Sequence, residues 1–158
     1  MDLPGLCPHC LGATIVGGAF GAISGGYGAF IGGGKLSDIL IGAAVGGVAG
    51  AVAGAAISVG AMPAAGAALL NFGVNAQANL VGQGIAYNNA DPCKRPKLNL
   101  GAALTSGIAA MTGGLFGPAA GNSVGAMIGA AAIGLPADMA INAAGGSLLP
   151  TQYYPPER

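Results

Sequence analysis

The sequence predicts an all-α, membrane-inserting protein of about four to six helices, paired as Gly/Ala-rich hairpins with glycine-zipper packing. Three observations predict this class. Glycines recur every four residues, charged side chains are only 6% of the chain, and short polar turns separate long uncharged runs. An ordinary soluble domain contains about 25% charged residues. The uncharged runs, 39–90 and 98–137, are longer than the roughly 20 residues that a spanning helix needs.

The glycine spacing is the strongest of these signals. Glycines four residues apart lie on one face of a helix, and without Cβ atoms two backbones can touch there. Helices associate in this way in lipid, whereas in water each interior glycine costs about 1 kcal/mol relative to alanine. The predicted helix-packing residues form three rows: Gly17, Gly21 and Gly25; Gly42, Gly46, Gly50 and Gly54; and Gly113, Gly117, Gly121, Gly125 and Gly129.

The first two rows lie on neighbouring helical segments. Residues 11–33 predict a helix about 34 Å long, which ends in the Gly32-Gly33-Gly34 run. Ser37 is the expected N-cap of a second helix that extends to about residue 60, and Asp38 complements the positive end of its dipole. The short link between these segments predicts an antiparallel hairpin.

The third helical segment, residues 64–88, carries a row of amides. The row consists of Asn71, Asn75, Asn79 and Gln83. In a bilayer, such a row is expected to face a partner helix or water rather than lipid. We therefore identify these four residues as candidates for lining a pore. The alternatives are a hydrogen-bonded seam between helices, or a helix lying at a surface with its polar face wet.

The remaining segments are less regular. Residues 89–97 form a polar loop, either a solvated connection or a weakly basic spot held at an anionic leaflet. Residues 98–116 and 119–134 predict a second hairpin broken near Pro118, or alternatively one kinked helix. Residues 136–147 predict a short last helix. We divide the chain into a leader (1–10), a helical membrane-active domain (11–147) and an irregular tail (148–158).

Catalytic and metal-binding patterns are weak. The Cys7-Pro8-His9-Cys10 run resembles the active-site tetrapeptide of oxidising thioredoxin-fold proteins, but no strand precedes it to place the thiol at a helix N-terminus. Zinc binding together with Cys93 would lack a second C-x-x-C. We expect incidental thiols, no metal, no cofactor and no enzymatic activity; a soluble thiol enzyme is the weakest alternative. A formal net charge of zero also argues against a nucleic-acid partner.

Two stretches resemble a known family. Residues 18–54 resemble the glycine-rich helical hairpin that follows the core of Rhs/YD-repeat polymorphic toxins, and they read GAFGAISGGYGAFIGGGKLSDILIGAAVGGVAGAVAG. Residues 91–117 resemble the continuation of that region, and they read DPCKRPKLNLGAALTSGIAAMTGGLFG. The leader sequence DLPGL at 2–6 is similar to the DPxGL motif that closes the Rhs core. Its Leu and Pro are transposed, so we do not assign a cleavage site there.

The resemblance implies a function for the domain. Members of the family include pore-forming C-terminal toxins, delivered by type VI secretion, that depolarise the inner membrane of a competitor. The implied partners are the lipid bilayer, a cognate membrane immunity protein, and the Rhs cocoon and secretion spike of the parent effector. Further copies of the chain in the membrane are an open alternative. A different function is also open: a glycine-zipper translocation or anchoring segment without activity of its own.

Overall fold

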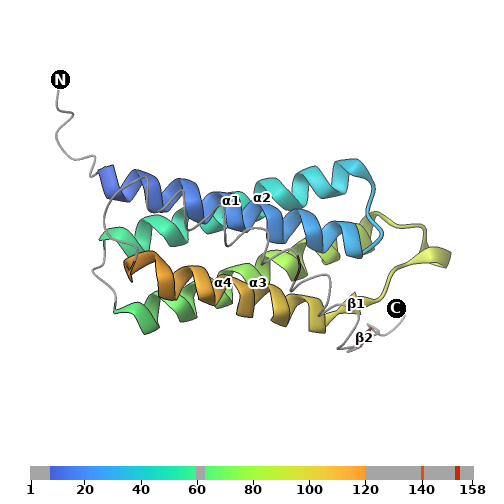
Figure 1. The fold of residues 1–158 in the computed structure, drawn as a ribbon. Coiled ribbons are helices and arrows are strands. Elements are labelled where there is room, and N and C mark those ends of the chain that lie inside the picture. The colour runs from blue at the N-terminus through green and yellow to red at the C-terminus, as the bar shows by residue number, and fades with distance from the viewer. Residues whose placement is uncertain (1–7, 60–62, 120–139, 141–151, 154–158) are drawn as a thin grey trace, which may run out of the picture.

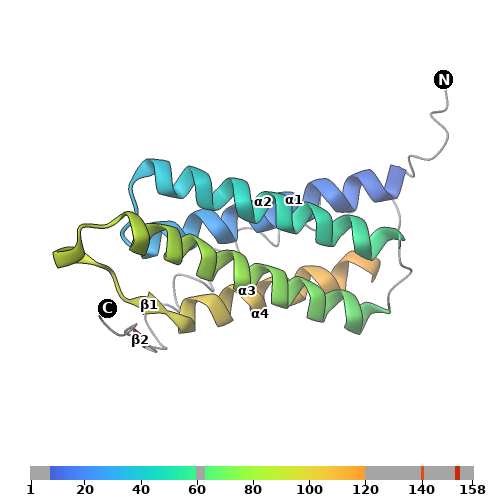
Figure 2. The same ribbon diagram turned by 180° about the vertical axis from the view of Figure 1, so that it is seen from behind.

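The computed structural model describes residues 8–59, 63–119, 140 and 152–153, and it is all-α as predicted. Helices α1 (Pro8–Ile31) and α2 (Leu36–Val59) form one antiparallel hairpin, and α3 (Ala64–Asn89) and α4 (Leu100–Ala119) form the other. The two hairpins lie one against the other as two layers (Figures 1 and 2). Helix α3 packs against all three other helices, and α2 packs against α1 and α3.

The turn between α1 and α2 is a glycine C-cap. Gly33 has φ of 71°, a left-handed conformation that glycine adopts without strain. The Gly34 amide donates to the Ala29 carbonyl (2.8 Å), and the Gly33 amide donates to the Phe30 carbonyl (2.9 Å). This pair of bonds is the Schellman motif, which satisfies carbonyls at the end of α1.

Helix α2 begins two residues earlier than the sequence predicts, at Leu36 instead of Asp38. The backbone amide of Lys35 donates to the Asp38 carboxylate (2.8 Å), so Lys35 is the N-cap and Asp38 stands three residues into the helix. Ser37 therefore lies in the first turn and is not the N-cap that we expected. The reason is that a carboxylate three residues ahead reaches back to the N-cap amide, as in a capping box.

The glycines of α1 and α2 bring the two backbones into contact. A Cβ built on Gly21 would overlap the carbonyl oxygen of Gly46 and lie 3.0 Å from the Cα of Gly50. The same overlap occurs in the reverse direction and repeats one turn away on either side. The reciprocal contacts pair Gly17 with Gly50, Gly21 with Gly46, and Gly25 with Gly42, and Gly54 faces Ala13. No side chain fits between the helices at these positions.

The second hairpin contains the polar connection. Helix α3 ends at Asn89, and the short 3-10 helix η1 (Pro92–Lys94) follows, with the Asp91 side chain accepting from the Cys93 amide (3.1 Å). Strand β1 (Leu98–Asn99) then pairs antiparallel with β2 (Gln152–Tyr153). Part of the tail that we predicted to be irregular thus returns to the start of α4.

The predicted helix bounds hold to within a few residues. Helix α1 begins at Pro8, inside the segment that we assigned to a leader without helical structure, and α3 extends one residue beyond the prediction. Pro118 lies in the last turn of α4 rather than after its end. The predicted helices at 119–134 and 136–147 fall almost wholly outside the described residues, as do Gly121, Gly125 and Gly129.

The interior of the bundle is small and polar. Within the described part, Phe20 is the one buried apolar side chain larger than alanine. The largest fully buried side chains are Gln83, Asn79, Ser24 and Ser106.

The exterior is made of large apolar side chains. Val48 in the middle of α2 is 69% exposed, and Leu36 at its start is 72% exposed. The outward-facing set comprises Leu11, Ile15, Phe30, Leu36, Leu40, Ile41, Val45, Val48, Val52, Leu69, Val81, Leu100, Leu104 and Ile108. A soluble domain would bury most of these side chains, so this distribution is the reverse of the usual one.

The contact between α1 and α2 can be tested by adding one methyl group. We expect Gly46→Ala to lower the free energy of unfolding by about 1–3 kcal/mol, because its Cβ would overlap the Gly21 carbonyl and push the helices apart. Gly73→Ala is the matched control, since a Cβ there meets nothing within 4 Å. The control is expected to gain up to about 1 kcal/mol from helix propensity. Unfolding followed by circular dichroism in detergent measures the free energy of unfolding of both variants. Equal changes in Gly46→Ala and Gly73→Ala would contradict the backbone contact.

Candidate functional site: a polar network inside the bundle

Three of the four predicted amides lie inside the bundle. Asn79 and Gln83 are 0% exposed and Asn75 is 2% exposed, whereas Asn71 is partly exposed. Their spacing of four residues places them along one face of α3, and that face bonds to α1 and to strand β1 at the start of α4. The row is therefore a hydrogen-bonded seam between helices in this arrangement, which is one of the alternatives that the sequence left open.

Ser24 of α1 joins the seam to two other helices. Its hydroxyl donates to Oδ1 of Asn75 (2.9 Å) and accepts from the hydroxyl of Ser106 in α4 (3.0 Å). Its carbonyl oxygen accepts from Nδ2 of Asn79 (3.4 Å). One serine thus bonds to α3 twice and to α4 once, at the place where the three helices meet.

Gln83 fixes the start of α4. Its Nε2 donates to Oδ1 of Asn79 (2.7 Å) and to the carbonyl of Asn99 (3.0 Å), and its Oε1 accepts from the Asn99 amide (2.5 Å). The side chain of Asn99 in turn accepts from the Ala102 amide (3.0 Å) as the N-cap of α4. A single amide side chain therefore pairs with the backbone of β1 in the way that a neighbouring strand would.

Close approach of the helices makes these bonds possible. A Cβ on Gly28 would overlap the carbonyl oxygen of Asn79, and a Cβ on Gly82 would overlap that of Gly25. A Cβ on Gly107 would lie 2.7 Å from the ring of Phe72. Glycines therefore let α1 and α4 approach α3 at the level of its amides.

Sequence reasoning found the amide row but missed its partners. Ser24, Ser106, Asn99, Gly28 and Gly82 were not among the predicted site residues. Gly28 and Gly82 carried a usable signal. Gly28 lies one turn after Gly25, and Gly82 lies one turn after Asn79, so each adds a small residue beside a predicted row, where a third helix can approach. The serines carried no signal that distinguishes them from surface serines.

The predicted packing glycines divide into two groups. Those of α1 and α2, from Gly17 to Gly54, lie in the interhelical contact. Gly113 and Gly117 lie in α4, but their surroundings fall outside the part of the chain that the structure describes.

The side chains of the network are suited to hydrogen bonding between helices and not to acid–base catalysis. Its members are amides and hydroxyls, none of which titrates near neutral pH. Among the described residues, no cluster of three His, Cys, Asp or Glu side chains could hold a metal ion. Cys93 is exposed in η1, whereas Cys10 lies at the start of α1, about 30 Å away along that helix. The backbone positions of Cys10 and Cys93 therefore lie at opposite ends of the bundle (Figure 1).

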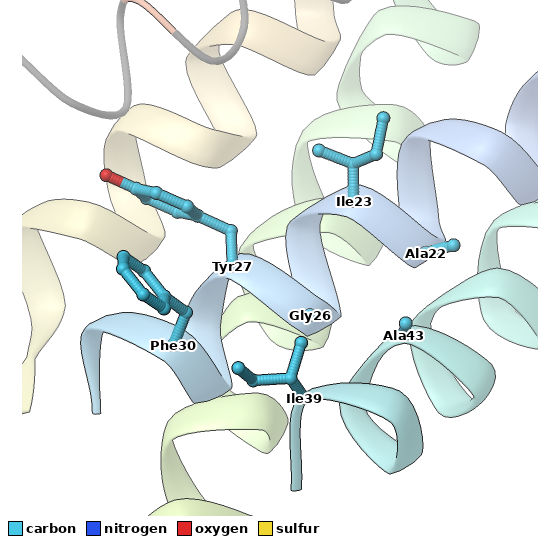
Figure 3. A pocket seen from close by; sticks show the side chains of 7 residues that line it. All are labelled: Ala22, Ile23, Gly26, Tyr27, Phe30, Ile39 and Ala43. Carbon is cyan, nitrogen blue, oxygen red and sulfur yellow. The ribbon is translucent and has the colours of Figure 1, made fainter. Parts of the chain in front are cut away.

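An apolar groove of about 330 Å³ lies on the outer face of the first hairpin (Figure 3). The rings of Tyr27 and Phe30 stand along it, with centroids 6.3 Å apart. Its lining is Ala22, Ile23, Gly26, Tyr27, Phe30, Ile39 and Ala43. The Tyr27 hydroxyl is the one side-chain polar group in this lining, so the groove has the chemistry of the surrounding apolar exterior and not that of an active site.

Among the described residues, two helices are long and apolar enough to cross a bilayer: Leu11–Ile31, with 21 residues, and Leu36–Ile57, with 22. Length and composition alone do not separate such helices from the core helix of a soluble protein. A core helix, however, is mostly buried, and here only 39% of the first apolar segment and 28% of the second are buried.

Comparisons with protein-family models, curated proteins and solved structures gave no significant match.

The link between α3 and α4 can be tested at Gln83. We expect Gln83→Leu to lower the free energy of unfolding by about 1–3 kcal/mol, because it removes the two hydrogen bonds from Gln83 to the part-buried backbone of Asn99 and the buried bond to Asn79. Hydrogen exchange at the Asn99 and Ala102 amides should accelerate more than exchange in the middle of α1. Asn88→Leu, which removes an exposed amide from the same helix, is the control and should change neither quantity. Unchanged exchange in Gln83→Leu would show that Gln83 does not hold the start of α4.

Proposed function

We propose that this chain is a pore-forming antibacterial toxin that inserts into the cytoplasmic membrane of a target cell and depolarises it by ion leakage. The observation that carries the proposal is the reversed distribution of side chains, with Val48 and Leu40 outside and Asn79 and Gln83 inside. In lipid, large apolar side chains gain nothing from facing one another, and polar side chains must find partners within the protein. The distribution thus fits a lipid environment.

The family resemblance supports the antibacterial part of the proposal. Residues 18–54, which resemble the first part of the region after the Rhs core, cover most of α1 and α2, and residues 91–117 cover the α3–α4 connection and most of α4. On this proposal the chain is secreted by a producer cell within an Rhs cocoon on a type VI spike. A membrane immunity protein protects the producer. The cocoon also keeps the apolar exterior away from water before delivery.

The pore itself requires a change in the network. The side-chain donors and acceptors of Asn79 and Gln83 are engaged within one chain, so they do not present an open polar path in this arrangement. Conductance therefore needs the hairpins to separate, or several copies to assemble with their amides facing a common axis. Few ionisable groups lie near the amide row, so the ion selectivity of such a pore should be modest.

The same network favours a second candidate function, a translocation or anchoring segment without activity of its own. A bundle whose buried polar side chains are paired, as those in the described part of this chain are, is suited to a stable membrane anchor. Expression of the 158-residue chain in cells that lack an immunity protein separates the two functions. A toxin stops growth and collapses the membrane potential, whereas an anchor does neither.

Current across a planar bilayer tests the pore, and a charge placed on the amide row tests its lining. We expect discrete conductance steps from the purified chain. Asn71→Asp should shift the reversal potential in a salt gradient toward cation selectivity, because Asn71 belongs to the row but is only partly buried. Asn88→Asp at the exposed end of α3 is the control for charge alone.

Each result has a definite consequence for the proposal. A silent bilayer, with insertion verified separately, would reject the pore and favour the anchor. Equal shifts in Asn71→Asp and Asn88→Asp would reject the assignment of the amide row to the pore lining while leaving the pore in place.

A further inference from the structure

The charged side chains that the structure describes gather at one end of the bundle. Lys35 lies in the α1–α2 turn and Asp38 in the first turn of α2, while the other four follow α3 in the connection to α4. The two connections lie side by side at the same end (Figures 1 and 2). Nδ2 of Asn89 donates to Oδ1 of Asp38 (2.7 Å), which joins the end of α3 to the start of α2.

This end of the bundle, which we call the basic end, presents mainly positive charge to its surroundings. Its four cations, Lys35, Lys94, Arg95 and Lys97, are all exposed. Of the two carboxylates, Asp38 is only 3% exposed and accepts from the Lys35 amide and from Asn89.

Two further contacts shape the basic end. Asp91 is exposed, and its carboxylate accepts from the Cys93 amide. The Arg95 guanidinium lies 5.0 Å from the centroid of the Tyr87 ring, so an aromatic side chain stands beside the cations. Tyrosine next to basic residues is the composition of a membrane–water interface.

The opposite end differs in kind. It contains the start of α1, the end of α2, the start of α3 and the end of α4 (Figure 1). None of the charged side chains that the structure describes lies there. The first hairpin is two helices of 24 residues each, about 36 Å long, which is enough to separate the two ends by the thickness of a bilayer core.

We propose that the basic end binds anionic phospholipid head groups and stays on the membrane face from which the chain arrives, while the opposite end enters the bilayer first. The inference rests on the membrane insertion proposed above and adds a lipid class and a direction to it. Moving four cations through hydrocarbon is strongly unfavourable, whereas the other end has no described charge to move. Anionic head groups attract each basic residue near the surface, strengthening binding about fivefold per residue.

The native cysteines report the direction of insertion. Cys93 lies at the basic end, and Cys10 lies at the opposite end, in the first turn of α1. We would prepare Cys7→Ser/Cys10→Ser, which keeps Cys93, and the matched Cys7→Ser/Cys93→Ser, which keeps Cys10. Each is added to the outside of sealed phosphatidylglycerol-containing vesicles and then treated with a membrane-impermeant maleimide, with detergent-solubilised chain as the reference.

The expected result is full labelling at Cys93 and background labelling at Cys10. Protection of Cys93, with or without labelling of Cys10, would overturn the direction. Labelling of both cysteines would overturn it as well, because the end that holds Cys10 would then not have entered. Conductance together with protection of Cys93 would support the pore and reject the proposed direction of insertion. A silent bilayer together with labelled Cys93 and protected Cys10 would reject the pore and support the direction.

The lipid class is tested by changing charge in the α3–α4 connection. Lys94→Gln/Arg95→Gln/Lys97→Gln should bind phosphatidylglycerol-containing vesicles on the order of 100-fold more weakly in a sedimentation assay. Asp91→Asn is the matched control of opposite sign. It keeps a side chain able to cap η1 and should bind up to about fivefold more tightly. Phosphatidylcholine vesicles should not distinguish the variants. Equal binding of all variants to anionic vesicles would overturn the role of the basic end.

Discussion

Backbone contact between α1 and α2 is the constraint on which the rest of the structure depends. Gly21 and Gly46 touch through their main chains, so the space between these helices has no room for a side chain. Large apolar residues of the same helices, such as Val48 and Ile15, must therefore point away from the contact. The glycine rows thus determine the exterior of the bundle as well as its interior.

An apolar exterior in turn determines what holds the bundle together. Burial of large side chains cannot supply the stabilisation, because few of them are buried. What remains is close packing of backbones, supplemented by hydrogen bonds such as those of Ser24 and Gln83. These are the forces that act between helices in lipid, where a polar group without a partner is most unfavourable. The small core, the paired amides and the apolar surface have one common explanation.

Much of the fold could be predicted from local pattern. The glycine spacing fixed which faces of α1 and α2 meet, and the Gly32-Gly33-Gly34 run placed the turn, because both depend on residues close in sequence. The start of α2 was misplaced since Ser37 and Asp38 both suit a helix N-terminus, and only the geometry decides that Asp38 reaches back to Lys35.

The candidate site was only half predictable. The spacing of Asn75, Asn79 and Gln83 placed them on one face of α3, but the sequence could not choose between water and a partner helix. That choice depends on Ser24 and Ser106, which are 82 residues apart and meet only in the folded chain. The pairing of β1 with β2 is non-local in the same way, and neither two-residue strand has a pattern of its own.

The central claim is tested most directly by measuring whether lipid or water surrounds the apolar exterior. A spin label at Val48, in the middle of α2, can be read by its collision rates with oxygen, which concentrates in lipid, and with a polar nickel complex, which stays in water. Reconstituted in vesicles, the label should be accessible to oxygen and shielded from nickel, while a label at exposed Lys94 should show the reverse. High nickel accessibility at Val48 would mean that this surface faces water, and the membrane account would be wrong.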